Sequence, residues 1–197
     1  IPLDAALCDY MLLSAHKIGG PQGVGALILR HGAPLAAQIL GGGQQGGLRA
    51  GTENLSGIAG FAAAAHSVRD GEGERARIQH LRDRFEALLK AAIPEARIFG
   101  DGAPRLIGTS QFALPGITSQ TALMALDLDG VWISAGASCS SGKIAPSHVL
   151  AAMGIEEALT SCALRVSLGW NSGMTDVEAA IAALTKIWQR KVGREAA

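Results

Sequence analysis

Residues 9–30 read Asp9-Tyr-Met-Leu-Leu-Ser14-Ala-His16-Lys17-Ile-Gly-Gly-Pro21-Gln-Gly23-Val-Gly25-Ala-Leu-Ile-Leu-Arg30, and this stretch decides the fold. Two short apolar runs, residues 9–14 and 24–30, are typical of buried strands. The glycine-rich turn between them predicts that the two strands are adjacent and antiparallel. Lys17 therefore lies where a strand ends, and ligands of open α/β sheets bind at strand ends.

The rest of the chain alternates between helical and extended patterns. Helices are predicted at residues 55–68, 74–92, 119–128, 147–153 and 175–191, and strands at 97–99, 109–114, 131–134 and 163–168. Thr175-Asp-Val-Glu178 has the form of a capping box that opens the last helix. Helices that alternate with short strands predict α/β or α+β layers. The charged, glycine-broken segment 70–74 is the expected domain boundary.

Composition limits the classes of function. Of 197 residues, 48% are apolar and 17% are charged, so a sizeable core is expected. Lys plus Arg equals Asp plus Glu, at 17 each, which gives no reason to expect nucleic acid or a membrane as partner. The longest apolar run, residues 58–65, is too short to span a bilayer, and no secretory signal is visible. Three widely spaced cysteines without a CxxC pair suit a reducing cytoplasm and argue against structural zinc.

Lys17 offers an amine, which can hold a carbonyl cofactor as a Schiff base. Such a lysine must be partly neutral, and burial or a neighbouring cation such as His16 favours the neutral form. In an extended chain Ser14 and His16 face the same side, so together they are suited to bind a phosphate. The alternative is a surface lysine at the end of a strand.

Cys139 lies in the loop Ser134-Ala-Gly-Ala-Ser-Cys139-Ser-Ser-Gly142, which has little bulk to bury the thiol. Reactive cysteines are partly exposed, whereas inert ones lie among apolar neighbours. The loop therefore favours a nucleophile, and the alternative is a turn in which a cysteine merely occurs. Cys8 and Cys162 each precede a predicted strand and are expected to be packing residues.

Two further positions are candidates for binding anions. Thr52 lies at the start of a predicted helix, where free backbone N–H groups favour a phosphate; an ordinary N-cap formed by Thr52 or Asn54 is the alternative. Arg165 lies within an apolar predicted strand, where a guanidinium is costly unless it is paired. Its partner is either a substrate carboxylate or an acidic side chain in a buried ion pair.

Together these motifs resemble those of cysteine desulfurases of the NifS/IscS type, in the class V aminotransferase group of enzymes that depend on pyridoxal phosphate. The matching segments are residues 14–27 for the cofactor lysine, 41–43 with 49–54 for a glycine-rich stretch, 134–142 with 146–150 for the catalytic cysteine, and 165–169 for the substrate carboxylate. Their order and spacing agree over essentially the whole chain. The resemblance implies the aspartate-aminotransferase-like fold, type I of the pyridoxal-phosphate enzymes, and a homodimer.

The resemblance also implies the residues that bind the cofactor. Lys17 would hold pyridoxal 5'-phosphate as a Schiff base and later move protons. Ser14 and His16 would bind its phosphate, and Thr52 would reach the phosphate in the partner subunit.

The substrate and the sulfur follow in the same way. Arg165 would bind the carboxylate of L-cysteine. Cys139 would attack the substrate sulfur, which gives a persulfide and releases L-alanine. The sulfur would pass to an acceptor protein, either an iron–sulfur scaffold or a relay for tRNA thiolation, in the cytoplasm.

The resemblance covers only the C-terminal half of such an enzyme. The histidine that stacks on the cofactor ring and the aspartate that pairs with the ring nitrogen belong to the family's upstream half. Because that half is missing and the sequence opens with Ile1, we expect a truncated or proteolysed piece, or one part of a split protein, that is inactive alone. Residues 1–70 would end the large cofactor-binding domain, and residues 71–197 would form the small domain with the Cys139 loop. The alternatives are a selenocysteine lyase, another class V aminotransferase, or a non-catalytic dimerisation or docking fragment.

Overall fold

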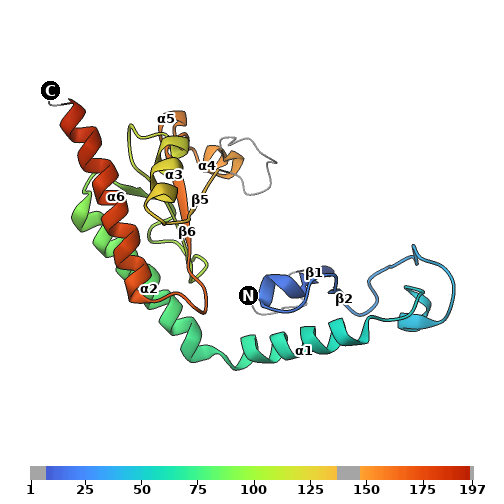
Figure 1. Cartoon of the computed structure of the whole chain (residues 1–197). Coiled ribbons are helices and arrows are strands. Elements are labelled where there is room, and N and C mark those ends of the chain that lie inside the picture. Colours follow the sequence, from blue (N-terminus) through green and yellow to red (C-terminus); the bar gives the residue numbers. More distant parts are fainter. Residues whose placement is uncertain (1–7, 137–146, 196–197) are drawn as a thin grey trace. The chain divides into compact units, whose positions relative to one another are not determined.

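The computed structural model describes residues 8–136 and 147–195 (Figure 1). Helices and strands alternate along it, which confirms the predicted α/β class. The chain divides into two compact units, residues 1–72 and 73–197. Among the helices of the described ranges, none is long and apolar enough to cross a bilayer.

The first unit contains the predicted antiparallel pair. Strand β1 (Tyr10–Ser14) pairs with β2 (Gly25–Leu29), with Tyr10 opposite Leu29 and Ser14 opposite Gly25. The short 3₁₀ helix η1 (Ala15–Ile18) follows β1 directly, and a second, η2 (Gln44–Gly47), lies in the glycine-rich loop. Helix α1 (Leu55–Asp70) closes the unit.

Helix α1 packs closely against the turn between the two strands. A β-carbon placed at Gly60 would lie 2.6 Å from Cγ of Pro21, so the helix backbone and the proline ring meet where only a glycine fits. The unit nevertheless buries little apolar surface. Large side chains stay open to solvent, with exposed fractions of 81% for Leu12, 81% for Leu40 and 75% for Leu55.

The second unit is built on a four-stranded antiparallel sheet in the order β3-β4-β6-β5. Its strands are β3 (Arg97–Ile98), β4 (Thr109–Ala113), β5 (Ser134–Ala135) and β6 (Ala163–Ser167). Its helices are α2 (Glu72–Ala92), α3 (Ser119–Leu128), α4 (His148–Ala152), α5 (Glu157–Thr160) and α6 (Met174–Glu195).

The main core lies between one face of this sheet and the helices α2, α3 and α6. Phe85 of α2 and Phe112 of β4 are fully buried with ring centroids 5.5 Å apart, and Leu164 of β6 packs in the same cluster. Side chains alternate between the faces of a strand. Ala113 and Ala163 therefore face the other side, where they form a smaller cluster that includes Cys162. The predicted packing role of Cys162 is confirmed, whereas Cys8 is only half-buried.

Two local predictions are wrong for identifiable reasons. The strand expected at residues 131–134 begins only at Ser134. Val131 instead belongs to the C-terminal cap of α3. Its N–H donates to the carbonyl oxygen of Leu126, and the N–H of Gly130 donates to the carbonyl oxygen of Asp127. With Gly130 at a φ of 73°, this is a Schellman motif.

The capping box at Thr175 is the second error. Helix α6 begins one residue earlier, at Met174. The carboxylate of Asp176, not Glu178, reaches back to accept the N–H of Gly173 at 2.8 Å. The bonding resembles half of a capping box, displaced along the chain.

Candidate active site

The amine of Lys17 lies on a 3₁₀ turn and not on extended chain. Strand β1 ends at Ser14, so the expectation that Ser14 and His16 share a side by strand alternation is wrong. A 3₁₀ helix brings residues three apart to the same side. Ala15, fully buried, and Ile18, half-buried, form the inner side, and His16 and Lys17 are exposed.

Glycines fix this turn in place. Gly19 ends η1 with a φ of 85°, a left-handed conformation that favours glycine. At Gly20, a β-carbon would lie 3.1 Å from the carbonyl oxygen of Ala15, and at Gly25 it would lie 2.6 Å from that of Leu13. The close backbone packing therefore holds the Lys17 turn at the end of the β1–β2 pair.

The polar side chains of the turn are free to bind a ligand. Ser14, His16 and Lys17 are all exposed. Within the described part of the chain, none of the three side chains has a hydrogen-bond or ion-pair partner. A hydroxyl, an imidazole and an amine form a donor set suited to a phosphate and to an aldehyde.

Thr52 lies on a separate loop, just before α1. Asn54, and not Thr52, is the N-cap of this helix: its Oδ1 accepts the N–H of Gly57 at 3.0 Å. The exposed Thr52 hydroxyl is therefore not needed to cap the helix. The loop before it is tightly coiled, with Gln45, Gly46 and Gly47 all at positive φ and the N–H of Gly51 bonded to Oε1 of Gln44.

Arg165 lies at the middle of β6, between two other strands. Gln111 of β4 is directly opposite it on one side and Ser134 of β5 on the other. Its Nε is buried, and among residues 8–136 and 147–195 nothing accepts a hydrogen bond from it. No acidic side chain of those residues forms an ion pair with Arg165, so the ion-pair alternative is not supported.

Cys139 lies outside the described residues. The segment that contains it follows β5 and is followed by Ser147, the N-cap of α4, whose buried hydroxyl accepts the N–H of Leu150. Both flanks belong to the same unit as Arg165. Ser14, His16, Lys17 and Thr52 belong to the first unit.

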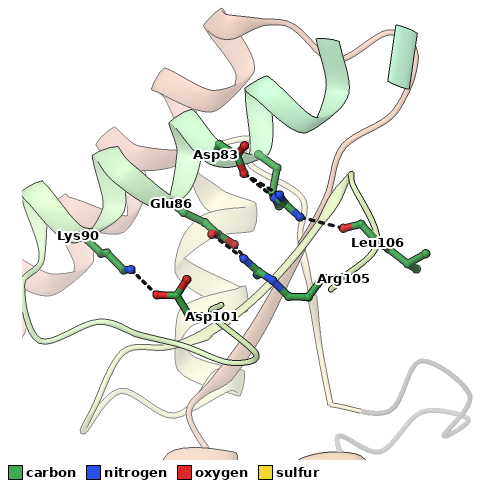
Figure 2. Close-up of polar contacts among 7 residues, drawn as sticks. Asp83, Glu86, Lys90, Asp101, Arg105 and Leu106 are labelled. Carbon is green, nitrogen blue, oxygen red and sulfur yellow. Dashed lines mark hydrogen bonds and ion pairs between the residues drawn. The ribbon is translucent and has the colours of Figure 1, made fainter. Parts of the chain in front are cut away.

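A polar cluster that the sequence did not reveal holds the segment leading into β4 (Figure 2). Arg105 donates to both carboxylate oxygens of Glu86, at 2.7 and 3.0 Å. Burial alone would raise the pKa of Glu86, but its hydrogen bonds and the nearby charges of Arg105 and Arg82 together outweigh burial, and the pKa lies below its ordinary value. Nearby, Arg82 donates to the carbonyl of Leu106.

A third arginine holds the turn that follows β6. Arg77 of α2 donates to the carbonyl oxygens of Ser172, at 2.6 Å, and Trp170, at 2.9 Å. It also pairs with Glu74, and the hydrogen bond from Arg77 lowers the pKa of that carboxyl. The strand that carries Arg165 is therefore anchored at its C-terminal end by side chains from α2.

Comparison with known proteins identifies the class. The aminotransferase class-V family matches residues 1–180, and the chain belongs to this family. Within it, the chain is 45% identical over 160 residues to a cysteine desulfurase of Cereibacter sphaeroides, covering 81% of this chain and 41% of that protein. It is 40% identical over 188 residues to an IscS-like cysteine desulfurase of Mycobacterium tuberculosis, covering 93% and 48%.

Solved structures agree with this assignment. A NifS-like protein from Rickettsia africae matches with a TM-score of 0.83 at 33% identity, over 96% of this chain and 50% of that one. Another NifS-like protein matches with a TM-score of 0.78 at 30% identity, over 93% and 47%. The implied fold is thereby confirmed. The chain spans about half the length of the curated relatives it matches.

Proposed function

We propose that the protein containing this chain is a cysteine desulfurase that depends on pyridoxal 5'-phosphate. The observation that carries the proposal is the exposed amine of Lys17, which has no partner among residues 8–136 and 147–195, on a glycine-closed turn at the end of a strand. Similarity to proteins named cysteine desulfurase, over 81–93% of this chain, supports the choice of reaction.

The domain assignment is part of the proposal. Residues 1–70 would belong to the large cofactor-binding domain, and residues 71–197 would form the small domain. The exposure of Leu12, Leu40 and Leu55 supports a first unit whose apolar surface is covered by more protein than the described residues supply.

The exposed side chains of the first unit fit the cofactor. Lys17 supplies the amine for its aldehyde, and Ser14 and His16 supply donors for its phosphate. Thr52 is proposed to reach the phosphate of the partner subunit in a homodimer. When bound, pyridoxal phosphate withdraws electrons from the bonds at the substrate α-carbon.

The substrate side of the reaction is assigned to the second unit. Arg165 binds the carboxylate of L-cysteine and so orients the sulfur. The thiol of Cys139 takes up that sulfur, so that L-cysteine and a thiol become L-alanine and a persulfide, with every atom accounted for. A protein acceptor in the cytoplasm, for iron–sulfur assembly or thiolation, then receives the sulfur.

Cofactor trapping and sulfur labelling test the proposal together. In the gene product that contains this chain, borohydride reduction is expected to fix the cofactor on the Lys17 peptide. Radiolabelled cysteine is expected to leave sulfur on Cys139. Cys139→Ser should abolish the sulfur label and retain the trapped cofactor, while the matched control Cys162→Ser should retain both.

Two results would contradict the assignment. Cofactor trapped on a lysine other than Lys17 would contradict the assignment of Lys17 as the cofactor lysine. Amine transfer that persists in Cys139→Ser, without sulfur transfer in the parent protein, would instead identify an aminotransferase.

A further inference from the structure

Three large apolar side chains lie open to solvent at the C-terminal end of α3. Met124 and Leu128, one helical turn apart, share a face of the helix, and Trp132 follows shortly after the helix ends. Their exposed fractions are 65%, 88% and 84%. The opposite face of α3 packs into the main core through Ala122 and Leu126. The three exposed side chains, the Trp132 patch, therefore contribute little to the core.

A hydrogen bond fixes the orientation of the Trp132 ring. The indole Nε1–H donates to Oδ1 of Asp127 at 2.9 Å. The backbone supports this arrangement, because the Schellman motif at the end of α3, with Gly130 at positive φ, turns the chain back toward the helix. An aromatic side chain that is already held in place loses little conformational entropy on binding. Tryptophan is also among the residues that contribute most to the stability of protein interfaces.

The charged side chains beside the patch are acidic. Residues 106–142 contain only two charged side chains, Asp127 and Asp129. Asp129 is paired with Lys186 at 2.6 Å. Asp127 is exposed, and within the described part of the chain no cationic side chain forms an ion pair with it. The patch therefore combines an aromatic ring with a carboxylate that the described residues leave without a counter-ion.

A ring and a carboxylate that lie side by side suit a guanidinium. The planar group of arginine stacks on aromatic faces, where the cation is attracted to the π electrons. The same group donates charge-assisted hydrogen bonds to a carboxylate. Met124 and Leu128 extend the surface with apolar area, and burial of such area against other apolar side chains is favourable. The chemistry that fits the whole patch is an arginine with aliphatic neighbours.

We propose that the Trp132 patch is a docking surface for a protein segment that carries an arginine between aliphatic residues. The arginine stacks on Trp132 and pairs with Asp127, and its aliphatic neighbours cover Met124 and Leu128. The proposal does not depend on the reaction at Lys17, because every contact lies on α3 and the turn that follows it.

Nuclear magnetic resonance of the full chain labelled with nitrogen-15 tests this docking. The probe is the capped peptide Gln-Leu-Arg-Leu-Gln, and the comparison is the same peptide with citrulline, which keeps the shape of arginine without its charge. The indole N–H resonance of Trp132 is expected to shift with the arginine peptide. That peptide should bind about two- to fivefold more tightly than the citrulline peptide, the range of an exposed ion pair. Trp170, an indole 82% exposed in the same unit, is the internal control and should not shift.

Two variants separate the charge from the ring. Asp127→Asn keeps an oxygen for the indole N–H but removes the charge. It should therefore weaken the arginine peptide about two- to fivefold and leave the citrulline peptide unchanged. Trp132→Ala should weaken both peptides, measured by fluorescence anisotropy of the labelled peptide, and the matched control Trp170→Ala should weaken neither. Circular dichroism checks that all three variants fold, as expected for exposed positions.

Three results would overturn the proposal. Equal affinity of the arginine and citrulline peptides would show that the charge of Asp127 has no role. A Trp132 resonance that shifts when the chain alone is concentrated would assign the patch to a contact between copies. Protection of Trp132 from hydroxyl-radical oxidation in the gene product that contains this chain, with no peptide present, would assign the patch to an internal contact.

Discussion

Glu86 on α2 accepts two hydrogen bonds from Arg105, at 2.7 and 3.0 Å, and this ion pair fixes the segment that leads into β4 (Figure 2). Only 10% of the Glu86 side chain and 18% of the Arg105 side chain are exposed. Arg82 adds a hydrogen bond to the carbonyl of Leu106, in the same segment. Because β4 pairs with the strand that carries Arg165, the cluster supports that strand from a distance.

Arg105→Ala should destabilise the chain by about 3 kcal/mol, because it leaves the buried Glu86 carboxylate without its partner. Denaturation with urea, followed by circular dichroism, measures this loss. Lys90→Ala is the control, since its ion pair with Asp101 is half-exposed and should contribute less than about 0.5 kcal/mol. Equal losses of unfolding free energy in the two variants would show that the burial of Glu86 does not strengthen its ion pair with Arg105.

The same carboxylate should make stability depend on acidity. The pKa of Glu86 in the folded chain lies below its ordinary value of 4.5, so the unfolded chain binds the proton more readily. The stabilisation is therefore complete above pH 4.5 and is lost as the pH falls through the lower folded value. Glu86→Gln should be less stable than the parent chain at pH 7, and the difference should shrink below pH 4.5. A difference that stays constant from pH 7 to acid conditions would contradict this account.

Gly60→Ala should destabilise the first unit by about 1 kcal/mol. The overpacking against Pro21, at 2.6 Å, outweighs the better helix propensity of alanine. Gly73→Ala is the matched control, because a β-carbon there meets nothing within 4 Å. Hydrogen exchange of residues 15–25 should accelerate in Gly60→Ala only. Adding Pro21→Ala should restore protection, and a double variant that exchanges as fast as Gly60→Ala would refute the contact.

Asn54→Ala should weaken helix α1 by about 1 kcal/mol, since it removes the hydrogen bond to Gly57 N–H. Thr52→Ala should leave the stability of α1 unchanged, because Thr52 does not cap the helix. If Thr52 binds phosphate, its variant should instead lower the affinity of the gene product for pyridoxal phosphate, measured by absorbance titration. A stability loss in Thr52→Ala equal to that of Asn54→Ala would assign both residues to the cap.

Much of the fold follows from local sequence patterns. The apolar runs around Lys17 predict the β1–β2 pair, and the apolar stripe of residues 74–92 predicts most of α2. The prediction of α2 succeeds because burial on one face imposes a period that the sequence records. Strand β1 forms although most of its side chains are exposed within the described residues. The strand expected to begin at Val131 does not form there. Val131 closes the C-terminal end of α3, where Gly130 at positive φ turns the chain.

The site is only partly predictable for a related reason. Lys17 and Arg165 can be picked out from the sequence without the structure. Lys17 follows the end of an apolar run, and Arg165 lies in the middle of one. Gln111 and Ser134 give no such signal, because their nearness to Arg165 depends on the register between strands far apart in sequence. The Glu86–Arg105 ion pair is likewise not predictable, because no sequence pattern indicates which charged residues far apart in the chain will pair.

The position of β6 inside the sheet also bears on how this protein can evolve. Both of its edges are bonded, to β4 and to β5, so a shift of the backbone at Arg165 would break two ladders at once. Strand β5, by contrast, is an outer strand of two residues and, within the described ranges, is bonded only to β6. Relatives that carry out the proposed reaction on a larger or smaller amino acid should therefore differ first along β5, whereas the strand that carries Arg165 should vary little.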